Sequence, residues 1–134
     1  MKRAVPEGAT QSDLAPESVV ALVLAALQRN DLPHTDAGIE TLYAFAAARL
    51  HAQVGDLGAF KRVLHNELFA PLLGHASANP EPLERRGGVA RQTVMVEDGG
   101  GAATPYLFSL VEQPQPDGPP LWLLSGLSRA DLPS

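Results

Sequence analysis

The chain contains no cysteine among its 134 residues. This absence excludes disulfide bonds, zinc sites with thiolate ligands, iron–sulfur clusters and a thiol nucleophile. A chain of this length can bury roughly two-thirds of the surface that it exposes when unfolded. It therefore needs neither a metal nor a disulfide to fold, and the redox compartment stays open.

Positive charge is also scarce. Ten lysines and arginines stand against fifteen aspartates and glutamates, which gives a formal net charge of −5. The adjacent pair Arg85 and Arg86 is too small to provide the broad basic surface with which proteins bind nucleic acid. We therefore expect no nucleic-acid partner.

Long apolar runs are absent as well. No run approaches the roughly 20 residues that cross a membrane. The N-terminus begins with a basic pair, but the apolar segment of a secretory signal does not follow it. We expect a cytoplasmic protein without membrane contact, in which residues 1–14 form a flexible tail and residues 15–130 form one domain.

The first half of the chain carries helical periodicity. In the first segment an apolar face is formed at helical spacing by Val19, Leu22, Val23, Ala26 and Leu27, and Val20 and Leu24 widen it. This width predicts a helix that is covered on more than one side. The three predicted helices cover residues 15–30, 37–52 and 57–73.

The second half carries strand patterns separated by glycine- and proline-rich links. The predicted strands cover residues 88–98, 104–113 and 120–128, with a further short strand within residues 72–77. Helices followed by strands predict an α+β fold: three N-terminal helices packed on a curved antiparallel sheet of three to five strands. The last two strands are apolar on both faces, so we expect a covered outer face or a sheet that curls around a pocket.

Several segments carry a family resemblance, and together they span roughly residues 17–129. They are "LAALQRNDLPHTDAGIETLYAFAA", "GAFKRVL", "PLLGH", "RRGGVARQTVMVEDGGG" and "LWLLSGL". In order and spacing they resemble domain-of-unknown-function family 4864, with plant and bacterial members, within the nuclear transport factor 2-like superfamily, also called SnoaL-like or cystatin-like. The chain departs from the family after Phe45, where "AAARLHAQ" looks helical and the family has a proline-containing loop.

This resemblance implies a cone in which helices pack into the mouth of the curved sheet. The superfamily includes isomerases, dehydratases and cyclases as well as non-catalytic ligand binders and dimer-forming modules. A shared fold therefore does not decide the function.

The segment "RNDLPHTDAGIE", residues 29–40, is the most polar part of the helical half. Asp31, His34 and Asp36 offer mixed ligands for a divalent ion, but their spacing matches no known template. We favour a turn without metal, in which Asn30 ends one helix and Asp36 caps the next. Asp31 is unfavourable at a helix C-terminus, so we expect its carboxylate to reach backbone N–H groups at the start of the second helix.

Five polar or aromatic residues are expected around a ligand pocket. His75 lies where the helices give way to the sheet, and Gln92 faces either the pocket or solvent. The aromatic residues can equally fill the core, which we prefer for Trp122. The five expected pocket residues are Tyr43, His75, Gln92, Tyr106 and Trp122.

Signatures of catalysis are weak. The chain has no Gly-x-Ser-x-Gly elbow, and no lysine follows the glycines of residues 99–101. We therefore expect a protein without a cofactor that binds a small apolar ligand, forms a homodimer through its sheet, or does both. The alternative is an isomerase or dehydratase that uses Asp36, Tyr43 and His75 as acid and base groups.

Overall fold

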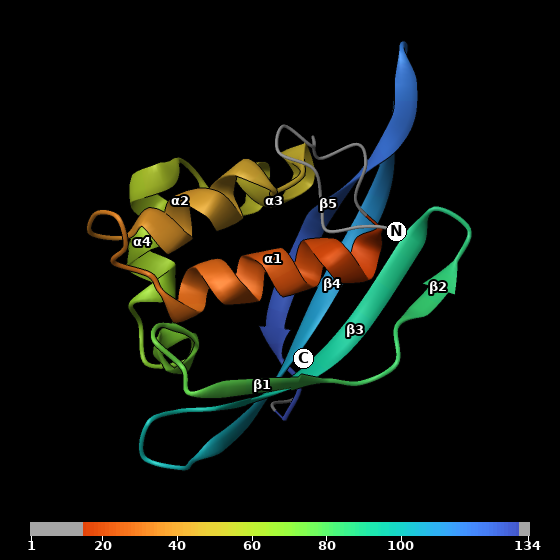
Figure 1. Ribbon diagram of the computed structural model, residues 1–134. Coiled ribbons are helices and arrows are strands. Elements are labelled where there is room, and N and C mark those ends of the chain that lie inside the picture. The colour runs from red at the N-terminus through yellow and green to blue at the C-terminus, as the bar shows by residue number, and fades with distance from the viewer. Residues whose placement is uncertain (1–14, 132–134) are drawn as a thin grey trace, which may run out of the picture.

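The computed structural model describes residues 15–131, and the predicted tail, residues 1–14, lies outside that range. Figure 1 shows helices packed against one antiparallel sheet, which confirms the predicted α+β class. The elements are α1 (Pro16–Gln28), α2 (Ala37–Ala44), α3 (Ala48–Val54), α4 (Leu57–Leu64), the 3-10 helix η2 (Ala70–Leu72), β1 (Ser77–Pro80), β2 (Glu84–Arg86), β3 (Val89–Glu97), β4 (Ala103–Gln115) and β5 (Gly118–Arg129).

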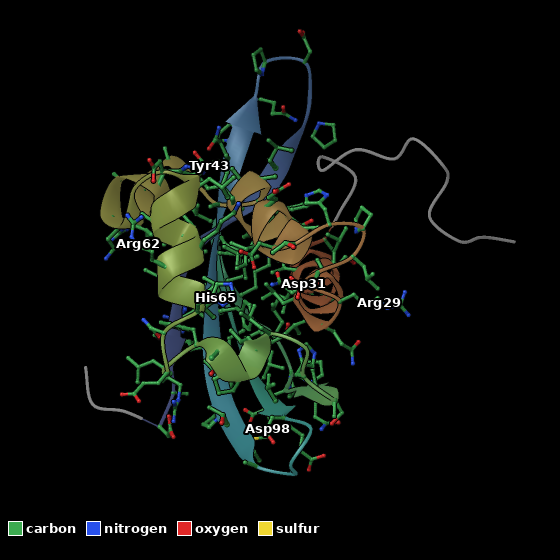
Figure 2. All side chains as sticks on the ribbon, turned by 90° about the vertical axis from the view of Figure 1, so that its left-hand side faces the viewer. Arg29, Asp31, Tyr43, Arg62, His65 and Asp98 are labelled. Atoms are coloured by element: carbon green, nitrogen blue, oxygen red, sulfur yellow. The ribbon has the colours of Figure 1, made fainter. Side chains whose placement is uncertain are left out.

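Among the described residues, the sheet is open and has five strands. Its order is β1–β3–β4–β5, and β2 pairs with the same edge of β3 as β1 does, nearer the start of β3. β4 and β5 are the longest strands, and their hairpin extends beyond the helices (Figure 1 and Figure 2). Within residues 15–131 no helix is long and apolar enough to cross a membrane.

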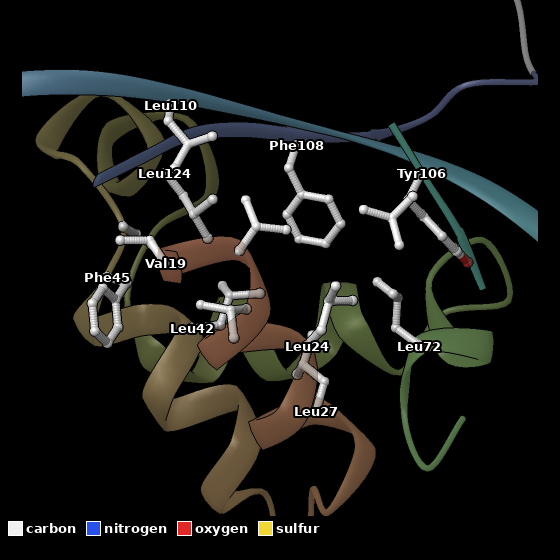
Figure 3. Packing of buried hydrophobic residues seen from close by; sticks show 14 of the residues in the cluster. Val19, Leu24, Leu27, Leu42, Phe45, Leu72, Tyr106, Phe108, Leu110 and Leu124 are labelled. Carbon is white, nitrogen blue, oxygen red and sulfur yellow. The ribbon is translucent and has the colours of Figure 1, made fainter. Parts of the chain in front are cut away.

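The core lies between α1 and the inner face of the sheet. Val19, Val23 and Leu27 are fully buried because their spacing of four residues puts them on one side of α1. Alternate residues of β4, including Phe108 and Leu110, point toward them from the sheet. Figure 3 shows side chains of this core between the strands and the helices, among them Val19, Phe108 and Leu110.

The prediction of one continuous second helix over residues 37–52 is wrong. The structure divides it into α2 and α3, so residues 15–131 contain four α-helices rather than three. The backbone of Phe45 accepts a hydrogen bond from Leu124 of β5 at 2.8 Å, and that of Ala47 donates to Leu124 at 2.7 Å. Residues 45–47 therefore pair with the edge of β5 instead of continuing the helix.

The predicted third helix is also shorter than expected. α4 ends at Leu64, and its start is capped by Asp56, whose carboxylate accepts a hydrogen bond from the N–H of Ala59 at 2.9 Å. After α4, Asn66 organises a turn by accepting hydrogen bonds from two backbone N–H groups. η2 then leads the chain to the sheet.

α1 and α2 approach each other closely at Gly38. A Cβ at this position would collide with the backbone carbonyl of Ala26 and lie 2.8 Å from the Asn30 side chain. The Gly38 N–H donates to the Asn30 carbonyl at 2.9 Å. The helix hairpin therefore depends on a residue without a side chain at this contact.

Candidate functional site

A groove of about 310 Å³ lies between α1 and the strands β1 and β3. We call it the α1–β1 groove. Its apolar lining residues are Val20, Ala21, Leu24, Ala25, Ala78 and Pro80, and its polar lining residues are Glu17, Gln28, His75 and Gln92. The volume is at the lower end of the range found for small-molecule sites.

The second apolar stripe of α1 forms part of this groove. Val20 and Leu24 lie beside the core-facing residues of α1, and both are buried while lining the groove. Ala21 and Ala25 continue the same side of the helix with small side chains, which leaves open volume above them. The predicted widening of the apolar face by Val20 and Leu24 is thus confirmed, whereas Leu22, also expected on that face, is 38% exposed.

Gln28 fixes the far end of the groove. Its amide Nε2 donates to the backbone carbonyls of His75 and Ala76, each at 3.1 Å. One residue away, the N–H of Gly74 donates to the Leu27 carbonyl at 2.9 Å. The end of α1 and the segment before β1 are therefore bound together, which holds His75 in place.

His75 is buried, and its orientation is fixed by one hydrogen bond. Its Nδ1 lies 2.8 Å from the Leu72 carbonyl oxygen, which can only accept, so Nδ1 carries the proton. Neutral His75 then has an unprotonated Nε2, and no residue in the described range hydrogen-bonds to that atom. His75 is one of the two predicted pocket residues that line the groove.

Gln92 is the second predicted pocket residue that lines the groove, and only one end of its side-chain amide has a hydrogen-bond partner in the described range. Its Nε2 donates to the Glu81 carbonyl at 2.8 Å, which leaves Oε1 to face the other way. Oε1 is buried and has no hydrogen-bond partner among residues 15–131. Buried polar atoms without a partner are uncommon in proteins, so this oxygen requires an explanation.

The other three predicted pocket residues do not line this part of the described structure. Tyr106 is fully buried, donates its hydroxyl to the Leu68 carbonyl at 2.7 Å, and has a pKa that burial raises to about 12. Trp122 is buried with the Arg85 guanidinium 4.8 Å from its ring centre. Tyr43 packs edge-on against Phe60, with ring centres 5.0 Å apart.

A second polar site joins the helices. We call it the turn cluster, and it consists of Asn30, Asp31, Asp36 and His65. The Asp36 carboxylate accepts hydrogen bonds from Asn30 Nδ2 and from His65 Nε2, both at 2.8 Å. Burial on its own would raise the pKa of Asp36, but these hydrogen bonds outweigh it and hold that pKa below its usual range.

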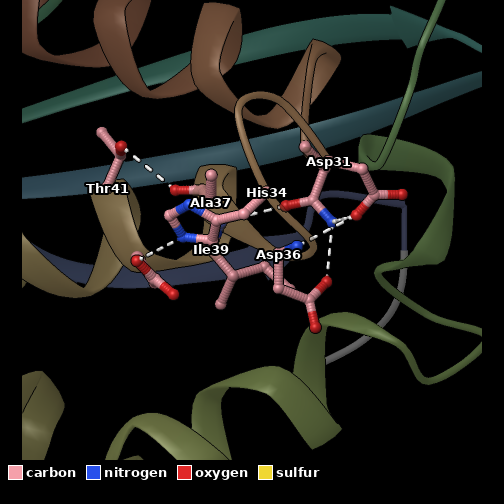
Figure 4. Close-up of polar contacts among 8 residues, drawn as sticks. Asp31, His34, Asp36, Ala37, Ile39 and Thr41 are labelled. Atoms are coloured by element: carbon pink, nitrogen blue, oxygen red, sulfur yellow. Dashed lines mark hydrogen bonds and ion pairs between the residues drawn. The ribbon is translucent and has the colours of Figure 1, made fainter.

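The capping expected from Asp36 is wrong, because its side chain is occupied within the turn cluster and its backbone has a positive φ of 61°. Asn30 caps α2 instead, since its Oδ1 accepts a hydrogen bond from the N–H of Ile39 at 3.0 Å. The expectation for Asp31 is confirmed, because its carboxylate accepts from the N–H of Asp36 at 3.0 Å. Figure 4 shows these contacts.

The three candidate metal ligands do not converge. His34 contacts Glu40 at 3.0 Å on the exposed side of α2, away from the Asp31 and Asp36 contacts. No group of three or more metal-ligating side chains occurs within residues 15–131. Tyr43, a residue of the alternative catalytic set, is well separated from Asp31 and His65 in Figure 2.

Sequence reasoning missed two features of these sites. The pairing of His65 with Asp36 joins residues 29 positions apart, and no local pattern indicates it. Glu17 and Gln28 at the groove looked like ordinary polar residues of α1, although both fall on the side of Val20 and Leu24. That shared side was the available signal.

Comparisons with family models, with curated proteins and with solved structures found no match.

Proposed function

We propose that the protein binds a small, largely apolar molecule in the α1–β1 groove without catalysing its reaction. The observation that carries this proposal is Gln92 Oε1, a buried acceptor without a partner beside a groove of about 310 Å³. Leaving such a group unpaired costs about 1–3 kcal/mol, which a bound molecule can recover. Apolar walls with a few polar groups are typical of small-molecule sites.

The separation of the candidate catalytic residues favours binding over catalysis. Acid–base chemistry needs at least two groups within hydrogen-bond reach of one reacting atom. Asp36 belongs to the turn cluster, Tyr43 packs against Phe60, and His75 lines the groove. An isomerase or dehydratase mechanism that uses all three finds no support in this placement.

Two neutral probes of similar size, cyclohexanol and cyclohexanone, test the proposal. We expect either probe to shift the backbone NMR signals of Ala21 and Ala78 during titration of the labelled protein. Ala25→Phe places a ring in the groove and should abolish these shifts. Ala52→Phe, at an exposed position of α3, is the matched control and should preserve them. Absence of shifts with both probes, or shifts that survive Ala25→Phe, would contradict the proposal.

A second candidate function is homodimerisation through the outer face of the sheet. Val89 and Met95 point away from the core on β3 and are 53% and 37% exposed. A contiguous apolar patch on one sheet face is typical of an interface, and we propose that Val89 and Met95 belong to such a patch. We also propose that the sheet and its helices form the cone of the nuclear transport factor 2-like superfamily, as the resemblance to family 4864 implies.

Light scattering coupled to size-exclusion chromatography tests the dimer. We expect a dimer for the unmodified chain and a monomer for Met95→Glu, because a charge in an apolar interface is costly. Leu22→Glu is the control, since Leu22 on α1 has nearly the same exposure, 38%. A monomeric unmodified chain would contradict this second candidate.

A further inference from the structure

We propose that the molecule bound in the α1–β1 groove is a hydrogen-bond donor: an apolar body with an O–H or N–H head group, and not a carboxylate or phosphate. This inference rests on the proposed function and names the class of ligand. It follows from the polar atoms that the groove offers and from those that it lacks.

Gln92 offers an acceptor. Its Nε2 is within 2.8 Å of the Glu81 carbonyl, an atom that can only accept, so the amide cannot be turned around without placing two oxygens against each other. Oε1 is thereby left without a partner among residues 15–131, and Gln92 is only 7% exposed. Gln92 also lines the groove, so a donor bound there is the partner that we propose for Oε1.

His75 offers a second acceptor. The Leu72 carbonyl keeps the proton on Nδ1, so Nε2 of the neutral ring has a lone pair and no hydrogen. The hydrogen bonds from Gln28 to the carbonyls of His75 and Ala76 hold the backbone at this position. His75 is 4% exposed, so its ring has little freedom to exchange the two nitrogens.

The charge of the lining residues also disfavours an anionic ligand. Glu17 is the one acidic residue among those lining the groove, and no lysine or arginine from the described range joins it. A carboxylate or phosphate ligand would therefore meet a like charge and two acceptors without a cation to pair with. The six apolar lining residues favour a hydrocarbon body.

Three probes with one ring and different head groups test the inference by NMR titration. Cyclohexanol donates a hydrogen bond, cyclohexanone only accepts, and cyclohexanecarboxylate is an anion. We expect cyclohexanol to bind about tenfold more tightly than cyclohexanone, as the pairing of a buried acceptor implies, and the carboxylate to bind most weakly.

The variant Gln92→Met removes the acceptor at nearly constant volume. We expect it to bring cyclohexanol and cyclohexanone to within about threefold of each other, because the donor loses its partner. Gln53→Met, at an exposed position of α3, is the matched control and should leave the tenfold preference unchanged. A preference that persists in Gln92→Met would overturn the role of Gln92.

A spectroscopic readout keeps the test independent of how the variant folds. The side-chain carbonyl carbon of Gln92 in the unmodified protein should shift on addition of cyclohexanol and not on addition of cyclohexanone. Equal or tighter binding of cyclohexanone in the groove would overturn the inference and leave the proposed function intact. Failure of both neutral probes to reach the groove would instead remove the proposed function.

Discussion

Two buried side-chain amides, those of Asn30 and Gln92, differ in how completely they are paired. They are almost equally buried, 6% and 7% exposed. Asn30 donates to Asp36 at 2.8 Å and accepts from the N–H of Ile39 at 3.0 Å. Gln92 donates to Glu81 and accepts nothing from the part of the chain that the structure describes.

This difference separates a structural site from a binding site. In the turn cluster, the Asp36 carboxylate, the Asn30 amide and His65 satisfy one another, so the cluster joins α1, α2 and α4 without a further component. In the α1–β1 groove, an acceptor is held in place by its neighbours and left unpaired. The turn cluster, which includes the most polar segment of the helical half, is therefore internally paired. The α1–β1 groove is the candidate site for a ligand.

The largest expected effect concerns the close contact between α1 and α2 beside the turn cluster. Gly38→Ala should lower the free energy of unfolding by about 2–3 kcal/mol, because the added Cβ overlaps the backbone of Ala26 and forces α1 and α2 apart. Gly58 is also the second residue of an eight-residue helix, and a Cβ there lies 3.4 Å from its nearest neighbour. Gly58→Ala should be neutral or slightly stabilising in urea denaturation. Equal losses in both variants would contradict the close contact.

The next effect tests the pairing of Asn30. Asn30→Leu keeps the shape but leaves the Asp36 carboxylate and the Ile39 N–H each without one partner, so we expect a loss of about 2 kcal/mol in urea denaturation. Asn66→Leu removes a side chain that accepts from two N–H groups at an exposed turn, and should cost less than about 1 kcal/mol. A cost for Asn30→Leu no greater than that of the control would show that the turn cluster contributes little.

The pH dependence of the turn cluster is a smaller effect. Asp36 has a lowered pKa in the folded protein. Its ionised form therefore stabilises the fold at pH values above the ordinary pKa of 3.8. This contribution is lost as the pH falls through the lowered folded value. Asp36→Asn should therefore cost about 1 kcal/mol near pH 7, and its stability should converge with that of the unmodified chain well below pH 4.

The control for this comparison is Asp117→Asn, in the exposed turn between β4 and β5. Its stability should follow that of the unmodified chain across the same pH range, as measured by thermal unfolding. A gap between Asp36→Asn and the unmodified chain that stays constant in acid would mean that the lowered pKa of Asp36 does not contribute to folding.

The sequence predicted what depends on local periodicity. The core face of α1 follows from the spacing of Val19, Val23 and Leu27, and the alternation of β3 and β4 follows from their side chains. The break between α2 and α3 was not predictable, because it depends on backbone pairing with Leu124 almost 80 positions away. Alanine-rich residues 45–47 are equally compatible with a helix.

The candidate site was predicted in part for the same reason. His75 and Gln92 are polar residues at the boundary of apolar elements, and the structure brings both to one groove. Tyr106 and Trp122 have the same alternating pattern whether they fill a core or line a pocket, and they are buried in this protein. Asn30 and Asp36 are both residue types that cap helices, and the contact of Asp36 with His65, 29 positions away, could not be predicted from local sequence.

The most direct test of the central claim is the stability of Gln92→Met in the absence of any added ligand. If Oε1 is unpaired in the free protein, removing it relieves a cost of about 1–3 kcal/mol, which offsets the lost hydrogen bond to Glu81. The free energy of unfolding should then stay within about 0.5 kcal/mol of the unmodified chain or rise. A loss of about 2 kcal/mol, as expected for Asn30→Leu, would show that Gln92 Oε1 is already paired and is not the acceptor that a ligand uses.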